Sequence, residues 1–272
     1  MKMKKLLITL IFGLICTGLT LGTAWAEKLV MKGSTTVLPI AQRAAETFMN
    51  EYPDVQISVS GGGSGNGIKA LVDGTTDIAN ASRFIKQKEV ARAVENGHYP
   101  VPFGIAFDCI VPVVHNSNPV DDLSIDELKK IYQGKIKNWS EVGGKDMQIV
   151  VVSRDTSSGT YEVWEEKVLE GGRVFPGALL QASNGAVSQA VSKNKYAIGY
   201  IGLSYLNKEV KDLKVKGVRA SKDTAAAYPV SRTLYMFTDG WPEGVTLQFM
   251  NWIMHPEKGQ KVVESVGYVP LY

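Results

Sequence analysis

Cysteine and histidine are both scarce in this chain of 272 residues, which has two cysteines and three histidines. Cys16 lies in an apolar leader, so Cys109 is the only cysteine that we expect in the mature protein, and a single cysteine cannot form an intrachain disulfide. Its apolar surroundings, FDCIVPVV, predict a buried and unreactive thiol. The histidines, at positions 98, 115 and 255, lack the spacing of metal ligands. We therefore expect neither a metal site nor a cofactor.

The first 26 residues have the pattern of a cleaved signal peptide. Lysines at positions 2, 4 and 5 precede an uncharged apolar run over residues 6–21, and Ala24-Trp25-Ala26 supplies small residues for cleavage. A membrane anchor fits less well, because a span needs roughly 20 apolar residues. A lipid anchor on Cys16 also fits less well, because the residue before it is a bulky isoleucine. We expect a mature chain that begins at Glu27 and is exported to the periplasm or the medium.

The expected mature chain also lacks net charge. The whole sequence has 30 basic and 27 acidic residues, and three of the lysines lie in the leader, which leaves 30 − 3 = 27 of each sign. A balanced chain has no excess of basic residues to attract nucleic acid or a membrane surface. We expect no nucleic-acid partner, and any affinity for an anion must be local.

Strands, small polar turns and helices alternate along the chain. Three such units precede residue 100, and this alternation predicts an α/β fold with a parallel sheet and helices on both faces. The β-rich run over residues 103–115 is long enough to pass between two lobes. The expected strands are 29–32, 55–60, 77–81, 149–152, 197–203, 214–218 and 233–237. The expected helices are 39–50, a short one ending at 71, 87–95, 125–132, one opening at 159, one ending near 192, 243–254 and 257–266.

The stretch VVVSRDTSSGTYEVWEE, residues 150–166, has the pattern of an anion site. A buried strand runs into Arg154 and a short polar turn, and a helix begins at Gly159 with Ser158 well placed as its N-cap. The free N–H groups and dipole of a helix N-terminus favour an anion, and an arginine adds a fork of donors. The alternative is an ordinary capped helix with a surface arginine. Similar turns elsewhere in the chain favour the anion site.

A glycine cluster at residues 61–67 admits several interpretations. It fits a dinucleotide-binding motif loosely, without a convincing acid for the ribose, and it resembles a phosphate loop whose lysine is one place out of position. A simpler interpretation is that the glycines let the backbone approach an oxyanion, while Ser64 caps the following helix and donates its hydroxyl. Asp77, Asp108 and Asp155 could pair as catalytic acids, but no nucleophile elbow or complete catalytic set is present. We do not expect an enzyme.

Seven segments in this order resemble the periplasmic phosphate-binding proteins of ABC importers, and together they cover essentially the whole mature chain. They are GSTTVLP, GGGSGNGIKAL, TDIANASRF, DELKKIYQGKIKNWSEVGG, SRDTSSGTYEVWEE, SNGAVSQAV and AIGYIGL. The resemblance implies a two-lobed periplasmic-binding-protein fold of type II with the ligand cleft between the lobes. It also implies a monomer that captures inorganic phosphate and passes it to a permease and its ATPase. The phosphate ligands that it implies are Thr35, Thr36, Ser64, Arg154, Ser158, Gly159 and Thr160.

One position departs from the best-known members of that family. They carry an aspartate that accepts the phosphate proton, and this chain has Ser82 there, followed by Arg83. A serine can accept a proton without repelling a fully ionised oxyanion, so we expect weaker rejection of sulfate. Other oxyanions (sulfate, molybdate or tungstate) stay open as ligands, and a secreted phosphate-ester hydrolase is a more distant alternative. We expect residues 27–107 and 228–272 to form lobe 1 and residues 108–227 to form lobe 2.

Overall fold

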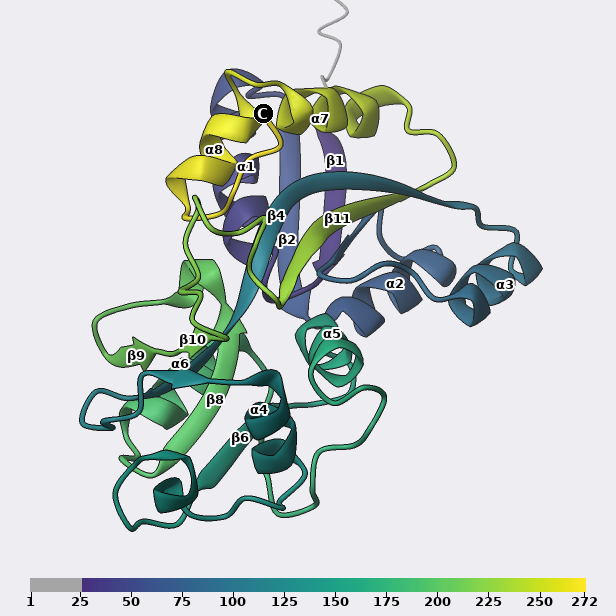
Figure 1. The fold of residues 1–272 in the computed structure, drawn as a ribbon. Coiled ribbons are helices and arrows are strands. Elements are labelled where there is room, and N and C mark those ends of the chain that lie inside the picture. Colours follow the sequence, from purple (N-terminus) through teal and green to yellow (C-terminus); the bar gives the residue numbers. More distant parts are fainter. Residues whose placement is uncertain (1–25) are drawn as a thin grey trace, which may run out of the picture.

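The computed structural model describes residues 26–272, so the predicted signal peptide and Cys16 lie outside the described residues except for Ala26. Two lobes lie one above the other, and the long strand β4 (Pro100–His115) runs from the upper lobe into the lower one (Figure 1). No helix between residues 26 and 272 is long and apolar enough to cross a membrane.

The upper lobe, called lobe 1 here, contains both ends of the described chain. Its elements are β1 (Glu27–Gly33), α1 (Leu38–Glu51), β2 (Val55–Gly62), α2 (Ser64–Val72), β3 (Ile78–Ala81), α3 (Gln87–Glu95), the first part of β4, β11 (Ser231–Asp239), α7 (Gly244–Met254) and α8 (Gly259–Ser265). The buried side chains of α1, α7 and α8 cover one face of the lobe 1 strands, and those of α2 and α3 cover the other. Pro39 in the first turn of α1 fits there because that position needs no N–H.

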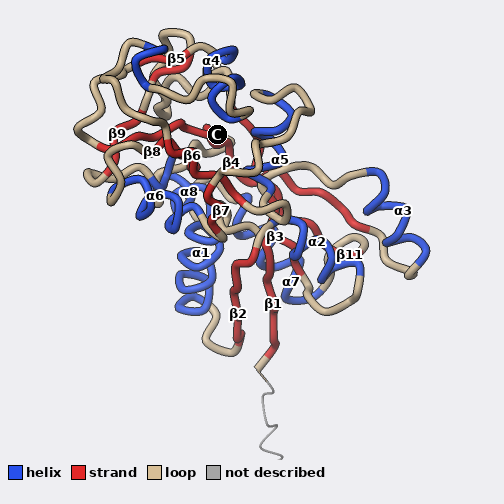
Figure 2. The backbone as a smooth tube through the Cα atoms, turned by 90° about the horizontal axis from the view of Figure 1, so that it is seen from below, coloured by secondary structure: helices blue, strands red, loops and turns tan. Residues whose placement is uncertain are grey.

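The lower lobe, called lobe 2 here, is formed by the middle of the chain. Its elements are the second part of β4, β5 (Asp122–Leu123), α4 (Ile125–Tyr132), the short helix η1 (Trp139–Val142), β6 (Val150–Arg154), α5 (Gly159–Lys167), β7 (Leu179–Gln181), α6 (Asn184–Ser192), β8 (Ala197–Gly202), the short helix η2 (Leu203–Tyr205), β9 (Val210–Asp212) and β10 (Lys214–Val215). Residues of α4 and α5 pack on one face of its strands, and residues of α6 pack on the other. Figure 2 shows the strands running through the molecule with helices on both sides.

The prediction of a parallel sheet was only partly correct, because the sheet is mixed. The strand order is β2-β1-β3-β11-β4-β8-β6-β7, with β9 beside β4. The pairs β1–β2, β1–β3, β6–β8 and β6–β7 are parallel, whereas β11 is antiparallel to β3 and β4, and β4 is antiparallel to β8 and β9. The chain enters lobe 2 along β4 and returns along β11, so these two strands must run in opposite directions.

Strand β4 belongs to both lobes. Residues 100–109 pair with β11, and residues 110–115 pair with β8 or β9. Cys109, at this transition, is fully buried, and burial raises the pKa of its thiol to about 12. The structure therefore confirms the prediction of a buried thiol, and the raised pKa keeps it in the unreactive protonated form at neutral pH.

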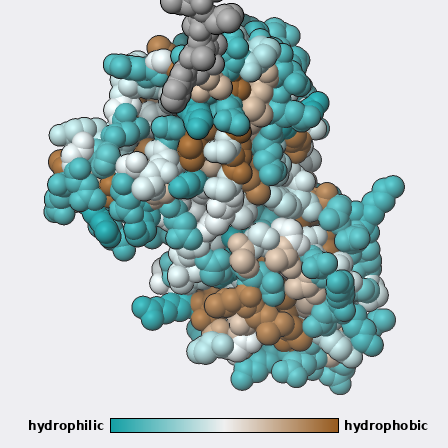
Figure 3. Space-filling view, turned by 180° about the vertical axis from the view of Figure 1, so that it is seen from behind, coloured by the Kyte–Doolittle hydropathy of each residue, from teal (hydrophilic) through white to brown (hydrophobic). Residues whose placement is uncertain are grey.

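The surface seen from behind is largely hydrophilic, with an apolar area on lobe 2 (Figure 3). Leu179 and Leu180 of β7, which is the edge strand of the sheet, are among the exposed large apolar side chains of this lobe. Lobe 1 contributes the exposed aromatic side chains of Phe84 and Trp241.

Candidate anion-binding site

All eight residues predicted as ligands are buried where the two lobes meet. Thr35, at 7 %, is the most exposed of the seven that carry a side chain, and Gly159 is also buried. In lobe 1 they follow β1, open α2 or follow β3, and in lobe 2 they end β6 or form the N-terminus of α5. They are Thr35, Thr36, Ser64, Ser82, Arg154, Ser158, Gly159 and Thr160.

Direct contacts join the residues of the two lobes. The hydroxyl oxygens of Thr36 and Thr160 lie 3.0 Å apart. A Cβ atom added to Gly159 would overlap Ser64 Oγ and would lie 2.8 Å from Ser82 Oγ. The turns that the sequence places at separate strand ends therefore meet at one point.

The N-terminus of α5 has the predicted cap. Ser158 is the N-cap residue, and its Oγ accepts a hydrogen bond of 3.2 Å from the Tyr161 N–H. The hydroxyl proton of Ser158 stays available for another acceptor. The helix is fixed to lobe 2 by Trp164, which is fully buried and stacks on Tyr200 with the ring centroids 4.4 Å apart.

The predicted role of Ser64 as a helix cap was wrong. Gly63 is the N-cap of α2, with φ of +100° and no side-chain cap, and Ser64 is the first helical residue. Ser64 Oγ instead accepts a hydrogen bond of 3.0 Å from the Ser82 N–H and lies 3.3 Å from Ser82 Oγ. Glycine is required at position 63 because a Cβ there would lie 2.7 Å from the backbone oxygen of Ser157 in lobe 2.

Arg154 is held by backbone carbonyls at the end of β7. Its Nε donates to the carbonyl of Gln181 at 2.9 Å, and its Nη2 donates to the carbonyl of Ala182 at 3.0 Å. Its Nη1 is buried without a hydrogen-bond partner among residues 26–272. Burial lowers the pKa of Arg154 by removing water from the charged form, and the positive charge of Arg232 lowers it further. Such a group favours an anionic partner.

Sequence reasoning missed a second arginine at this site. Arg232 of β11 pairs in register with Asp108 of β4, and its Nε and Nη2 lie 2.9 Å and 2.7 Å from Asp108 Oδ2. The same guanidinium donates to Thr160 Oγ1 at 3.1 Å and to Thr36 Oγ1 at 3.3 Å. Both threonine oxygens accept from Arg232 and the two hydroxyls hydrogen-bond each other, so one of their two protons stays available for another acceptor.

Asn184 was also missed as a site residue, although it opens the helix that was predicted to end near residue 192. It is the first residue of α6, and its Nδ2 donates to Thr36 Oγ1 at 3.0 Å and to Thr35 Oγ1 at 3.3 Å. Its Oδ1 accepts from the Gly202 N–H at 3.1 Å, which fixes the orientation of the amide. Asn184 thus orients two hydroxyls of lobe 1 from lobe 2.

The buried charges leave a positive excess at the site. Arg154 and Arg232 contribute two positive charges, and Asp108 contributes one negative charge. Serine and threonine hydroxyls and the N-terminus of α5 surround them. This set of donors suits a small anion with several oxygens. Within the described part of the chain, no three His, Cys, Asp or Glu side chains are close enough to hold a metal ion.

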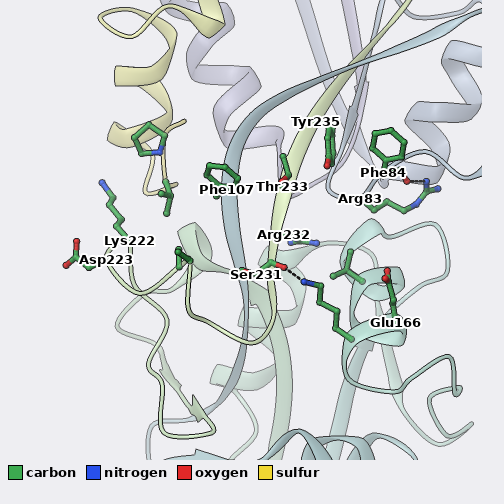
Figure 4. A pocket seen from close by; sticks show the side chains of 16 residues that line it. Arg83, Phe84, Phe107, Glu166, Lys222, Asp223, Ser231, Arg232, Thr233 and Tyr235 are labelled. Carbon is green, nitrogen blue, oxygen red and sulfur yellow. Dashed lines mark hydrogen bonds between the residues drawn. The ribbon is translucent and has the colours of Figure 1, made fainter. Parts of the chain in front are cut away.

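A pocket of about 680 Å³ lies beside this site, and none of the eight predicted residues lines it. Figure 4 shows Arg232 deep in the pocket, with Arg83, Phe84 and Tyr235 on one side of it. The pocket and the anion site thus share Arg232. We place the anion site among the buried hydroxyls and not in this pocket, because only there do donors from both lobes converge.

The fold and the site together define a class of protein, the two-lobed α/β binding proteins that hold a small ligand between their lobes. The model of the PBP superfamily domain matches residues 20–257. The chain therefore belongs to the PBP superfamily.

Relatives with established names are similar over nearly the whole chain. The phosphate-binding protein PstS of Bacillus subtilis is 35 % identical over 248 residues, which are 89 % of this chain and 80 % of that protein. The protein of the same name from Staphylococcus saprophyticus is 34 % identical over 260 residues, which are 88 % of this chain and 79 % of that protein. Both relatives are named as binding proteins.

Solved structures agree with this relationship. A substrate-binding protein of an ABC transporter from Clostridium perfringens, solved with bound phosphate, has a TM-score of 0.83 and 34 % identity, over 90 % of this chain and 100 % of that one. An ABC-type phosphate transport receptor from Vibrio cholerae has a TM-score of 0.71 and 29 % identity, over 89 % of this chain and 99 % of that one.

Proposed function

We propose that this protein is an exported receptor that binds inorganic phosphate between its lobes and delivers it to an ABC permease and its ATPase. One observation carries the proposal. Arg154 Nη1 is a buried charged donor without an acceptor among the described residues, and Arg154 ends the strand that leads to the N-terminus of α5. A buried donor of this kind costs free energy unless a ligand accepts its hydrogen bond. The phosphate-binding relatives support phosphate as that ligand.

The orientation of the hydroxyls explains how the site would hold a phosphate. Arg232 donates to the oxygens of Thr36 and Thr160, and Asn184 donates to those of Thr35 and Thr36. Thr36 Oγ1 accepts from both side chains, so its hydroxyl donates to Thr160 Oγ1, and the protons of Thr35 and Thr160 are left to bind phosphate oxygens. Arg154 Nη1 and the backbone N–H groups at the start of α5 complete the set of donors. The excess positive charge balances a monoanion and offsets half the charge of a dianion.

The Ser64–Ser82 pair supplies the acceptor that a protonated phosphate needs. Ser64 Oγ already accepts the Ser82 N–H, and Ser64 Oγ is the only side-chain partner of Ser82 Oγ within residues 26–272. When the Ser82 hydroxyl donates to Ser64, the lone pairs of Ser82 face no other donor. Ser82 can then accept the P–OH proton while Ser64 donates to another phosphate oxygen.

Isothermal titration with a panel of oxyanions tests the proposal directly. We expect phosphate to bind most tightly, with sulfate next and weaker binding of molybdate and tungstate, which have longer bonds to oxygen. Tighter binding of any other oxyanion would reassign the ligand within the same class of receptor. If no oxyanion bound, the proposal would fail.

A phosphate-ester hydrolase is the competing proposal from a different class, and the three candidate acids do not favour it. Asp108 is paired with Arg232, Asp77 accepts the Val30 N–H at 2.7 Å, and Asp155 accepts the Ser157 N–H at 2.9 Å. Each carboxylate therefore has a structural partner, and they do not form a shared dyad. A chromogenic phosphate ester incubated with purified protein should release no product above the rate without protein.

The proposal also includes the boundaries of the lobes, a monomeric state and cleavage of the signal peptide. We propose that residues 27–107 and 231–272 move as lobe 1 and residues 108–230 as lobe 2, three residues later than the boundary predicted at 228, in a monomeric protein released by cleavage before Glu27. Two separate apolar cores support this division. Tyr228 and Val230 pack with the core of lobe 2, so the crossing back to lobe 1 follows Val230.

A further inference from the structure

Arg83, which follows the predicted proton acceptor Ser82, does not belong to the anion site. It lies in a group of charged side chains between the lobes, which also contains Lys86, Glu89 and Glu162. Arg83 is 6 % exposed, and the side chain of Glu162 is 10 % exposed. Three of the four residues come from lobe 1, and Glu162 comes from α5 of lobe 2.

Arg83 is fixed within its own lobe before it meets Glu162. Its Nη1 and Nη2 lie 2.8 Å and 2.7 Å from the two carboxylate oxygens of Glu89. Glu89 is fixed in turn, because its Oε2 accepts the Lys86 N–H at 2.8 Å at the start of α3. A guanidinium held by two parallel hydrogen bonds has a defined orientation. Its remaining Nε–H side therefore stays turned outward from Glu89.

Glu162 occupies that remaining side from across the cleft. Its Oε2 lies 2.7 Å from Arg83 Nε and 2.5 Å from Lys86 Nζ. The Nε–H of Arg83 is not aligned for a hydrogen bond to Glu162 Oε2, so the contact between these two atoms is an ion pair. Pockets of about 680 Å³ and 450 Å³ are both lined by Arg83, Phe84 and Val163. The ion pair thus joins the two lobes, and both pockets lie next to the ion pair.

The position of Glu162 connects this ion pair to the anion site. It lies one helical turn after Ser158, and its N–H donates to the Ser158 carbonyl at 3.1 Å. Because α5 is fixed to the core of lobe 2 by Trp164, its N-terminus and Glu162 move together. An anion that draws the N-terminus of α5 toward Ser64 and Ser82 also brings Glu162 to Arg83.

We propose that Glu162 is a positioning residue that holds the lobes together around the bound anion by docking on the Arg83–Glu89 pair, without touching the anion. The proposal rests on the proposed function of the site. Part of the affinity then comes from an ion pair that forms only when the lobes meet. Because the docking partner is already ordered, Glu162 acts mainly on the rate at which the lobes separate and release the anion.

The test measures inorganic phosphate kinetics with Glu162→Gln, which keeps the shape of the side chain and removes its charge. We expect the dissociation rate constant to rise about tenfold, with the association rate constant nearly unchanged. The matched control is Glu166→Gln on the same helix, since Glu166 is exposed and forms no ion pair with any residue of the range 26–272. The control should keep the wild-type dissociation rate.

Two further measurements separate this role from a merely structural one. The urea midpoint of the ligand-free Glu162→Gln protein should equal that of wild type, whereas saturating phosphate should raise the midpoint of the variant less than that of wild type. In an Arg83→Gln background, Glu162→Gln should have little further effect on the dissociation rate. Lys86 remains there, but it is exposed and contributes little.

A wild-type dissociation rate in Glu162→Gln would overturn this inference and leave phosphate binding intact. The inference would also be overturned if Arg83→Gln and Glu162→Gln had additive effects on the dissociation rate. The same holds if Glu162→Gln lowered the urea midpoint of the ligand-free protein as much as that of the phosphate-bound protein. Failure of the wild-type protein to bind any oxyanion would instead overturn the proposed function, and the inference with it. If another oxyanion binds, the same comparison is made with that anion.

Discussion

Arg232 and Asp108 face each other across the β4–β11 pair where the chain passes between the lobes, with 2.7 Å between Nη2 and Oδ2. Both side chains are almost completely buried. The guanidinium also donates to Thr36 of lobe 1 and Thr160 of lobe 2. The ion pair thus links the crossing strands to hydroxyls on both sides of the anion site.

Arg232→Met should destabilise the ligand-free protein by about 3–5 kcal/mol, because it leaves the Asp108 carboxylate buried without its partner. Adding Asp108→Asn should recover part of that loss by removing the unpaired charge. Urea unfolding measures both effects. Arg219→Met is the control, since Arg219 is 42 % exposed in its ion pairs with Asp121 and Asp212. Equal losses in the buried and exposed cases would contradict the assigned role.

Arg154→Ala should weaken phosphate binding by about 2–5 kcal/mol, because a desolvated anion loses its one free charged donor. Arg154→Lys should recover only part of the loss, since an ammonium group cannot keep both carbonyl contacts and also reach the ligand. Titration calorimetry measures both. Arg173→Ala is a suitable control, because Arg173 is exposed and forms no ion pair with the residues described. Unchanged affinity in Arg154→Ala would exclude Arg154 as a ligand.

Ser82 should set the preference for phosphate over sulfate. At neutral pH phosphate carries at least one proton and sulfate carries none, so only phosphate can donate to Ser82 Oγ. One unpaired buried polar group costs about 1–3 kcal/mol, which corresponds to a roughly tenfold to hundredfold preference. Ser82→Asp should widen the preference and Ser82→Ala should narrow it. Competition titrations of sulfate against phosphate on the three proteins measure this preference. If Ser82→Ala prefers phosphate as strongly as wild type does, another group accepts the phosphate proton.

Gly159→Ala should lower phosphate affinity at least about tenfold, because the added methyl group overlaps Ser64 Oγ and crowds Ser82 Oγ where the lobes meet. Gly185→Ala makes the same change in the first turn of α6, where the nearest atom to the added Cβ is 3.9 Å away. That variant should bind as wild type does. Calorimetry on the two alanine variants provides the comparison, and equal affinities would show that the lobes do not approach each other at Gly159.

Local signals were sufficient for most elements and for the predicted group of ligands. Ser158 accepts the Tyr161 N–H as a serine before a helix should, and the turns after β1 and β3 do meet the N-terminus of α5. Their role as phosphate ligands stays a prediction. The short strands β5, β7 and β9 were missed, because two or three residues carry no measurable alternation.

Arg232 could not be predicted because its role depends on strand register. An arginine in a strand gives no local sign of function, and only the pairing of β11 with β4 places it opposite Asp108. Asn184 gives an equally ordinary signal at the start of a helix, and the arrangement of the lobes brings its amide to Thr35 and Thr36. Ser64 is an example of a local signal that misled. A serine that follows glycines and precedes a helix resembles an N-cap, but Gly63 is the N-cap residue of α2.

The position of β11 in the sheet has a consequence for folding during synthesis. β11 lies between β3 and β4, so the sheet of lobe 1 stays in two pieces until residues near 239 have been made. The strands that precede it expose unpaired edges over most of translation, and the contacts that complete the lobe join residues far apart in sequence. The nascent chain therefore cannot reach its final fold early. A polypeptide that we propose to be exported would benefit from that delay.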